Sequence, residues 1–318
     1  MLSRHAENLF WIGRYVERAE DTARLLDVTY HGVLEAGSER PAAEVWLECL
    51  EMLMLEDEGI EEIGGETVGE RLIADRSEPG SLVSIVGKAR ENARTTRELL
   101  ASEVFEAIND LHLHLVATDL VTLARERPYE VLRRVKSSCQ AVNGSVDASM
   151  PRGEGYRFFL IGQRLERALI TTRVLRVWHR RALELGAQAA FSEWVRLLRS
   201  VSAYEAYLRT FRAAIEEANV MAFLLQSPDF PRSVLHCLRM VENLLDELGM
   251  GEVGAPVRRS AGRLRSEGEF ADLSRMTGSD LDGHLQSLEA GVLQMAGDVE
   301  KAFFRPAGPV FMHSYEAF

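Results

Sequence analysis

The sequence predicts an all-α protein, a helical bundle built from two similar halves. Long segments place apolar residues three and four positions apart, as helices do, and no segment shows the period-two alternation of strands with matching turns. The nine prolines lie between these periodic segments. A stretch near the start of the chain also recurs half a chain later, which indicates an internal repeat.

The composition and net charge of the chain indicate which classes of partner it does not bind. The 318 residues are 46% hydrophobic and 27% charged, with a formal net charge of -12, which disfavours nonspecific binding to nucleic-acid backbone. Charged residues interrupt the N-terminal segment where a signal peptide is apolar, and no apolar run approaches the roughly 20 residues of a membrane span. We expect a cytoplasmic protein that binds neither nucleic acid nor membrane, with three reduced, apolar cysteines at Cys49, Cys139 and Cys237.

In the first half, Ser3 is the expected N-cap of a helix that runs to about Leu34 and ends before Gly37. Pro41 is expected to open the next helix, and an acidic, glycine-containing loop should cover residues 51–70. Further helices are expected over residues 81–100, 102–125 and 128–144.

A segment rich in glycine and polar residues, 143–155, is the expected boundary between the halves. After it we expect the repeated helix, a long helical segment over 191–225, and a helix over 233–248. A break at 249–256 and a last helix over 280–304 should follow. We therefore predict one domain over 1–304, with pseudo-repeats 1–150 and 151–304 and an irregular tail at 305–318.

The repeat is clearest at a shift of 149 residues. It aligns Phe10, Gly13, Glu17, Arg18, Thr22 and Arg24 with Phe159, Gly162, Glu166, Arg167, Thr171 and Arg173. Pro79–Gly80–Ser81 falls against Pro231–Arg232–Ser233 at nearly the same offset, each before a long helix. Two such units would pack most simply around a pseudo-twofold axis, with the repeated helices near it.

At about 100° per residue, the opening helix has two faces. The expected core stripe is Leu9, Ile12, Tyr15, Val16, Ala19, Ala23 and Leu26. The second stripe is charged but also contains Phe10, Trp11 and Leu25, so we expect it to be partly buried, with its charges paired. Its charged members are Glu7, Arg14, Glu17, Arg18, Asp21 and Arg24.

The repeat separates two kinds of residue in this stripe. Charges that recur in both copies should hold the two helices together as Glu–Arg pairs, namely Glu17, Arg18, Arg24, Glu166, Arg167 and Arg173. Glu7, Arg14 and Asp21 do not recur, so they are where a site on one half is expected. The candidate catalytic carboxylates are Glu7, Glu17 and Asp21.

A second dense segment lies at residues 89–97. Arg90, Arg94 and Arg97 share one helical face beside Glu91 and Asn92, and could bind a phosphate or carboxylate or pair with the acids of the opening helix. The candidate substrate-binding residues are Arg4, Arg14, Arg18, Arg90, Glu91, Asn92 and Arg94.

Motifs of several enzyme classes are missing from the sequence. It has no phosphate-binding GxxxxGK[ST], GxGxxG, HExxH or GxSxG motif, and no ExxH pair of a di-iron site. We expect no cofactor and no transition-metal site.

Four segments together resemble the bacterial alpha-E family, a helical domain of unknown function named for its Glu-Arg motif. They are LSRHAENLFWIGRYVERAEDTARLLD at the start, ARENAR at 89–94, GEGYRFFLIGQRLERA at 153–168 and FPRSVLHCL at 230–238. Tyr156 stands where that family would have Trp. The resemblance implies genes for a circularly permuted ATP-grasp protein and a transglutaminase-like peptidase nearby, and hence a peptide- or amide-ligase pathway.

The resulting hypothesis is a non-ATPase component of an ATP-grasp amidoligase system. It would bind the ATP-grasp partner, or a peptide-like intermediate, in an Arg/Glu-lined cleft between Glu7–Arg24 and Arg90–Arg97. Two alternatives stay open: an enzyme that uses a Glu or Asp of the opening helix as general base, and a purely structural helical scaffold.

Overall fold

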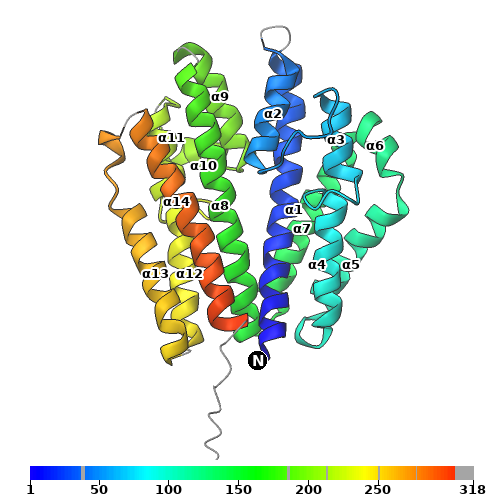
Figure 1. Ribbon diagram of the computed structural model, residues 1–318, viewed down its shortest axis with the longest axis vertical. Helices are drawn as coiled ribbons and strands as arrows, with labels where there is room; N and C mark the ends of the chain where they lie inside the picture. Colours follow the sequence, from blue (N-terminus) through cyan, green and yellow to red (C-terminus); the bar gives the residue numbers. More distant parts are fainter. Residues whose placement is uncertain (37–39, 185–186, 213, 250, 277, 305–318) are drawn as a thin grey trace, which may run out of the picture.

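The computed structural model describes residues 1–36, 40–184, 187–212, 214–249, 251–276 and 278–304, and these residues form helices and no strand (Figure 1). The all-α prediction is therefore confirmed. The predicted tail at 305–318 lies outside the described residues.

The first half of the chain contributes seven α-helices. They are α1 (Ser3–Ala36), α2 (Ala42–Met52), α3 (Gly65–Ala74), α4 (Leu82–Thr95), α5 (Ser102–Ala117), α6 (Leu120–Glu126) and α7 (Pro128–Ser149). The described part of the second half adds α8 (Glu154–Glu184), α9 (Ala187–Ser200), α10 (Tyr204–Thr210), α11 (Glu217–Gln226), α12 (Val234–Leu248), α13 (Gly251–Glu269) and α14 (Ser279–Val299), which continues as a π-helical turn, η3 (Glu300–Phe304).

Helices α1 and α8 lie side by side in the centre of the molecule and point the same way (Figure 1). The N-terminal ammonium of Met1 is 2.8 Å from a carboxylate oxygen of Glu154, so both helices begin at the same end. Helices α4 and α7 cover α1, and α5 packs against both of them. Helices α12 and α14 cover α8 in the same way, with α13 against both.

One continuous hydrophobic core joins the two halves. It includes buried side chains of α1, α2, α7, α8, α9 and α12, among them Leu26, Trp46, Leu132, Phe159, Trp194 and Val241. Burial of this apolar surface is the main favourable contribution to folding, at roughly 25 cal/mol per Å². The central helices are therefore held by the core of both halves.

Serine N-caps begin helices α4 and α12. Ser81 Oγ accepts a hydrogen bond from the backbone N–H of Ser84 at 3.2 Å before α4, and Ser233 Oγ accepts from that of His236 at 3.1 Å before α12. Each cap satisfies a backbone donor that the first helical turn leaves free. The two caps fix where these helices start against the central pair.

Several predicted helix boundaries were wrong. Helix α7 continues past Gly144 to Ser149, because Val142 and Val146, four residues apart, keep one face in the core. The expected break at 249–256 is mostly the start of α13, which contains Pro256.

Other segments contain more separate helices than predicted. The segment 102–125 is broken between α5 and α6, where Asp119 caps α6 by accepting a hydrogen bond from the backbone N–H of Thr122 at 3.2 Å. The segment 191–225 holds three helices, α9, α10 and α11. Helix α3 begins inside the expected acidic loop, at Gly65.

Candidate functional site: the pocket beside the central helix pair

The two central helices touch through their backbones at a pair of glycines. A Cβ added to Gly13 would lie 2.0 Å from the carbonyl oxygen of Phe159, and one added to Gly162 would lie 2.0 Å from that of Phe10. Any side chain at either position would therefore force the helices apart. This close approach brings the charged stripe of α1 against the matching stripe of α8.

Buried ion pairs cross the contact in both directions. Arg167 donates to both carboxylate oxygens of Glu17, at 2.6 and 2.7 Å. In return, Arg18 and Arg14 each donate through Nε to Glu166, at 2.6 and 2.7 Å. Bidentate and charge-assisted bonds of this kind are the strong class of hydrogen bond, and they hold the register of α1 on α8.

Arg232, at the start of α12, reaches the acids of α1. Its Nη1 lies 2.7 Å from Asp21 Oδ1 and 3.2 Å from Glu17 Oε1, and its Nη2 lies 3.2 Å from Glu20 Oε1. The Arg232 side chain is 9% exposed. Glu17 is thus bound by two guanidinium groups, those of Arg167 and Arg232.

Two of the residues predicted to pair across the helices have other partners. Arg24 Nη2 binds Glu20 of its own helix at 2.5 Å, and Arg173 Nε binds Glu289 of α14 at 2.7 Å. The sequence did not reveal these partners because Glu20 does not recur in the second copy and Glu289 lies far along the chain.

Three buried carboxylates of this network have shifted pKa values, and the direction of the shift differs among them. Burial opposes ionisation of Glu17, but Arg167 and Arg232 outweigh it and lower its pKa to about 2. For Glu166, burial is likewise outweighed by Arg14 and Arg18, and its pKa is about 2. Burial raises the pKa of Asp21 to about 7, with Glu17 and Glu20 adding to the rise and Arg232 opposing it.

These values decide between the candidate catalytic groups. Glu17 is fully buried, ionised and bound by two guanidinium groups, which makes it a poor general base. Asp21 has a pKa near neutrality but is 4% exposed, so no substrate can reach it. Glu7 is half-buried on α1 and forms no ion pair with any described residue.

A pocket of about 460 Å³ opens next to this network. It lies where α1, α8, the end of α2 and the turn before α4 meet, and is lined by Trp11, Tyr15, Arg18, Thr22, Leu53, Met54, Leu55, Glu78, Pro79, Gly80, Lys88, Glu166, Ile170 and Arg173. One wall is aromatic, because the rings of Trp11 and Tyr15 stack with centroids 5.3 Å apart. Tyr15, predicted to belong to the core stripe, instead lines this wall.

The accessible charges of the pocket are cationic. Arg18 is one-third exposed and, among the described residues, uses only Nε for its bond to Glu166. Lys88 is exposed, and its Nζ donates to the Pro79 carbonyl at 3.3 Å without pairing with any described carboxylate. The carboxylates of Glu166 and Glu78 are nearly buried and already bound, the latter by Arg71.

Among the described residues, the charged residues of segment 89–97 interact with neighbours on α4 and α5 and not with the acids of the opening helix. Arg90 and Arg94 both bind Glu91 on the same helix, and Arg90 Nε also donates to Asn109 at 3.4 Å. Arg97 lies over the ring of Phe105, 4.5 Å from its centroid. Of the predicted substrate-binding residues, only Arg18 lines the pocket; Arg14 lies behind it on Glu166, Asn92 is half-buried on α4, and Arg4 is exposed near the start of α1.

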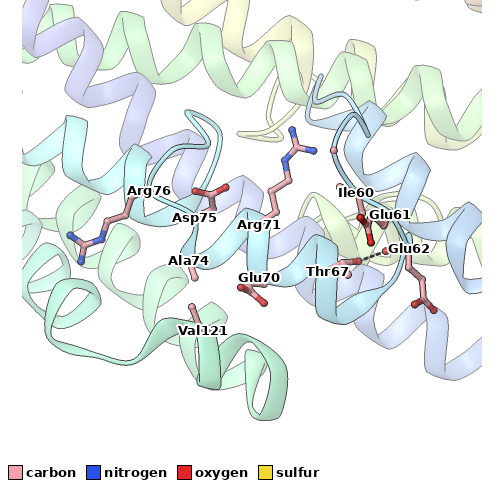
Figure 2. Close-up of a pocket in the computed structure, with 11 residues that line it drawn as sticks. Ile60, Glu61, Glu62, Thr67, Glu70, Arg71, Ala74, Asp75, Arg76 and Val121 are labelled. Atoms are coloured by element: carbon pink, nitrogen blue, oxygen red, sulfur yellow. Dashed lines mark hydrogen bonds between the residues drawn. The ribbon is translucent and has the colours of Figure 1, made fainter.

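A larger groove of about 670 Å³ lies away from the central pair (Figure 2). Its labelled residues come from the loop before α3, from α3 and the turn that follows it, and from α6, and include the acidic Glu61, Glu62 and Glu70. Arg125 neutralises Glu70 at 2.6 Å. No three His, Cys, Asp or Glu side chains of the described residues are arranged to hold a metal ion.

The family comparison agrees with this architecture. A model described as "a predicted alpha-helical domain with a conserved ER motif", Alpha-E, matches residues 1–304. The chain belongs to the Alpha-E family. In this Alpha-E domain the dipeptides Glu17–Arg18 and Glu166–Arg167 both form ion pairs across the central helix pair.

Two mycobacterial proteins resemble this Alpha-E domain. Uncharacterized proteins of Mycobacterium bovis and Mycobacterium tuberculosis are each 27% identical to it over 327 aligned residues, which cover 92% of this chain. The match takes in 35% of each relative, so the chain spans about a third of their length. No solved structure matches the chain. Among the described residues, no helix combines the length and apolar character that crossing a membrane requires.

Proposed function

We propose that this Alpha-E domain is the non-ATPase, ligand-binding component of an ATP-grasp amidoligase system. The pocket beside the central pair would hold a peptide-like intermediate, and a circularly permuted ATP-grasp protein would be the partner, as the family resemblance implies. The observation that carries the proposal is that Arg18, one-third exposed and bonded to Glu166 through Nε, lines an aromatic-walled pocket together with Lys88.

The chemistry of the pocket suits such an intermediate. Guanidinium and ammonium groups bind carboxylates, and Arg does so with a planar fork that matches their geometry. The stacked rings of Trp11 and Tyr15 offer an apolar surface for the rest of the ligand. Pockets that combine an apolar wall with a few fixed polar groups are the usual form of small-molecule sites.

The geometry favours binding over catalysis by the opening helix. Glu17 and Asp21 are buried, paired with Arg167 and Arg232, and do not line the pocket, so neither is placed to accept a proton from a ligand. In the proposed system the ATP-grasp partner activates the carboxylate, and this domain presents or receives the peptide-like molecule.

Two charge reversals on one helix test the proposal. Lys88→Glu changes the rim of the pocket, whereas Arg94→Glu changes an exposed arginine on the same helix that pairs only with Glu91 among the described residues. In a reconstituted mixture with the ATP-grasp partner, Lys88→Glu should lower product formation about tenfold, which corresponds to about 1.4 kcal/mol of lost binding. Arg94→Glu should leave product formation unchanged.

Complex formation with the ATP-grasp partner is measured alongside, by co-elution of the two proteins. Both variants should still bind the partner, because neither residue belongs to the folded core. Unchanged product formation with Lys88→Glu, or loss with Arg94→Glu alone, would contradict the placement of the site in the pocket.

A further inference from the structure

The turns before α4 and α12 occupy equivalent places on the two central helices. Both begin with proline and end with the capping serine, at backbone angles of -72° and 152° for Ser81 and -71° and 148° for Ser233. Helix α4 packs on α1, and α12 packs on α8. The middle residue differs: it is Gly80 in one turn and Arg232 in the other.

The Arg232 side chain fills the space between its turn and the opposite central helix, α1. Its backbone carbonyl accepts a hydrogen bond from Thr171 Oγ1 of α8 at 3.1 Å, while its side chain crosses to the acids of α1. The space between the turn and the opposite central helix is therefore occupied by the protein's own guanidinium. Arg232 is, in effect, an internal ligand of Glu17, Glu20 and Asp21.

Gly80 has no side chain to reach the opposite central helix, and the equivalent place is part of the pocket, beside Leu55. The pocket contains Gly80, Thr22 and Glu166, the counterparts of Arg232, Thr171 and Glu17 at the repeat offsets. Ile170 lines it where the other side has Asp21, and Arg14 takes the second position on Glu166 that Arg232 takes on Glu17. The open side thus lacks an internal side chain and has a surplus of cations.

We infer that Gly80 creates the ligand site, and that the site takes a molecule with a carboxylate joined to an apolar or aromatic group. The inference rests on the proposed function for the pocket and adds the ligand class and the residue that opens the site. The carboxylate would meet Arg18 and Lys88, and the apolar part would pack on Trp11 and Tyr15. The second half of the chain has no such site because Arg232 closes it.

The test restores the closed arrangement. Gly80→Arg places in the pocket the side chain that closes the other half, and Gly80→Ala is the matched control without a guanidinium. A Cβ at this position would meet the side-chain end of Leu55 at 2.9 Å, which a flexible side chain accommodates. If Gly80→Arg is poorly folded, the double variant with Ile170→Asp supplies the acid that Asp21 supplies to Arg232.

Binding is measured by tryptophan fluorescence of the full chain. Trp11 is the half-buried one of four tryptophans; Trp46, Trp178 and Trp194 are at most 6% exposed. The probe is N-acetyl-phenylalanyl-glutamate, and its uncharged diamide is the control ligand. The wild type should bind the acid at least about tenfold more tightly than the diamide.

Gly80→Ala should bind the acid within about threefold of the wild type, and Gly80→Arg at least about tenfold more weakly, with an unchanged melting temperature. Wild-type protein that does not bind the acid below about 10 mM, or Gly80→Arg that binds it like the wild type, would overturn the inference. If the wild type binds the probe as expected but Lys88→Glu leaves the pathway product unaltered, the proposed function is refuted while the ligand class stands.

Discussion

The charged residues between α1 and α8 form a network in which the buried carboxylates of Glu17 and Glu166 each have two guanidinium partners. Arg167 and Arg232 bind Glu17, and Arg14 and Arg18 bind Glu166. An ionised group removed from water is tolerated only with such partners, and deleting one side leaves the other charge buried and unpaired. The network should therefore be costly to break even though it adds little net stability over a well-packed apolar contact.

Glu166→Gln tests that cost. Because the substitution leaves Arg14 without a charged partner in the core, it should lower the free energy of unfolding by about 3–5 kcal/mol. The control is Glu247→Gln, which removes an ion pair with Arg157 in which Glu247 is 57% exposed, and should cost less than about 1 kcal/mol. Urea denaturation measures both, and an equal loss in the two variants would rule out a buried network.

Asp21 gives the network a pH dependence. Its pKa of about 7 in the folded protein lies above its ordinary value of 3.8, so the folded state binds this proton more tightly than the unfolded state. The stability that Asp21 contributes is fully present below about pH 4 and is lost as the pH rises through 7.

The measurement compares the wild type with Asp21→Asn between pH 4.5 and 8. The difference in unfolding free energy, wild type minus variant, should fall with pH by up to about 1.4 kcal/mol per unit and level off above pH 7. A difference that rises with pH would mean that Asp21 is ionised and stabilised by Arg232 throughout.

At the scale of elements, the glycine contact between α1 and α8 positions everything else. Gly13 and Gly162 each lie against the backbone carbonyl of a residue on the facing helix, and Arg14, next to Gly13, binds Glu166, one turn after Gly162. A larger residue would shift the helices and move Arg14 and Arg18 away from Glu166.

Gly13→Ala should destabilise the protein by about 2–4 kcal/mol, because the added methyl group overlaps a carbonyl that cannot move without its helix. Gly144→Ala is the control: Gly144 is exposed in the middle of α7 with nothing within 4 Å, so alanine should stabilise by up to about 1 kcal/mol. Thermal unfolding of both variants tests the contact, and a neutral Gly13→Ala would contradict it.

The sequence predicted the main helices and the buried charged stripe, but it did not predict the pocket. Helical periodicity identified α1, α4, α8 and α12, and apolar residues among the charges of α1 indicated a buried ionic stripe. The pocket depends on the absence of a side chain at Gly80, where the corresponding turn of the second half has Arg232, and sequence patterns do not show what such an absence leaves accessible. Gly80 lines the pocket together with Glu166 and Ile170 of α8, and its difference from Arg232 can be interpreted only once the two turns are placed on the helix pair.

For Arg90 and Arg94 the error was to predict a binding site where the structure shows side chains that are already paired. Their spacing suggested an anion site or a partner for α1, but Glu91 lies within reach of both on the same helix. Lys88, two residues earlier and without a charged partner among the described residues, lines the pocket instead. Residue spacing places side chains on a helical face, but it does not show which of them are already paired.

At the scale of the whole molecule, the two halves share one core and one ionic network. The ion pairs that cross between α1 and α8 join residues about 150 positions apart. Arg232 of the second half likewise binds acidic residues of the first half, among them Asp21. Since Glu166 of the second half also forms part of the open pocket, neither half contains the complete site. Ligand binding in the pocket should therefore depend on the intact helix pair.

The most direct measurement of the central claim is hydrogen–deuterium exchange of the full chain with and without N-acetyl-phenylalanyl-glutamate. Residues 53–55 and 78–88 contribute to the open pocket, and their amides should exchange more slowly when the peptide is bound. The closed counterpart at 231–236 should not change. Protection confined to the outer groove at 59–76, or no protection at 78–88 under saturating peptide, would contradict the account.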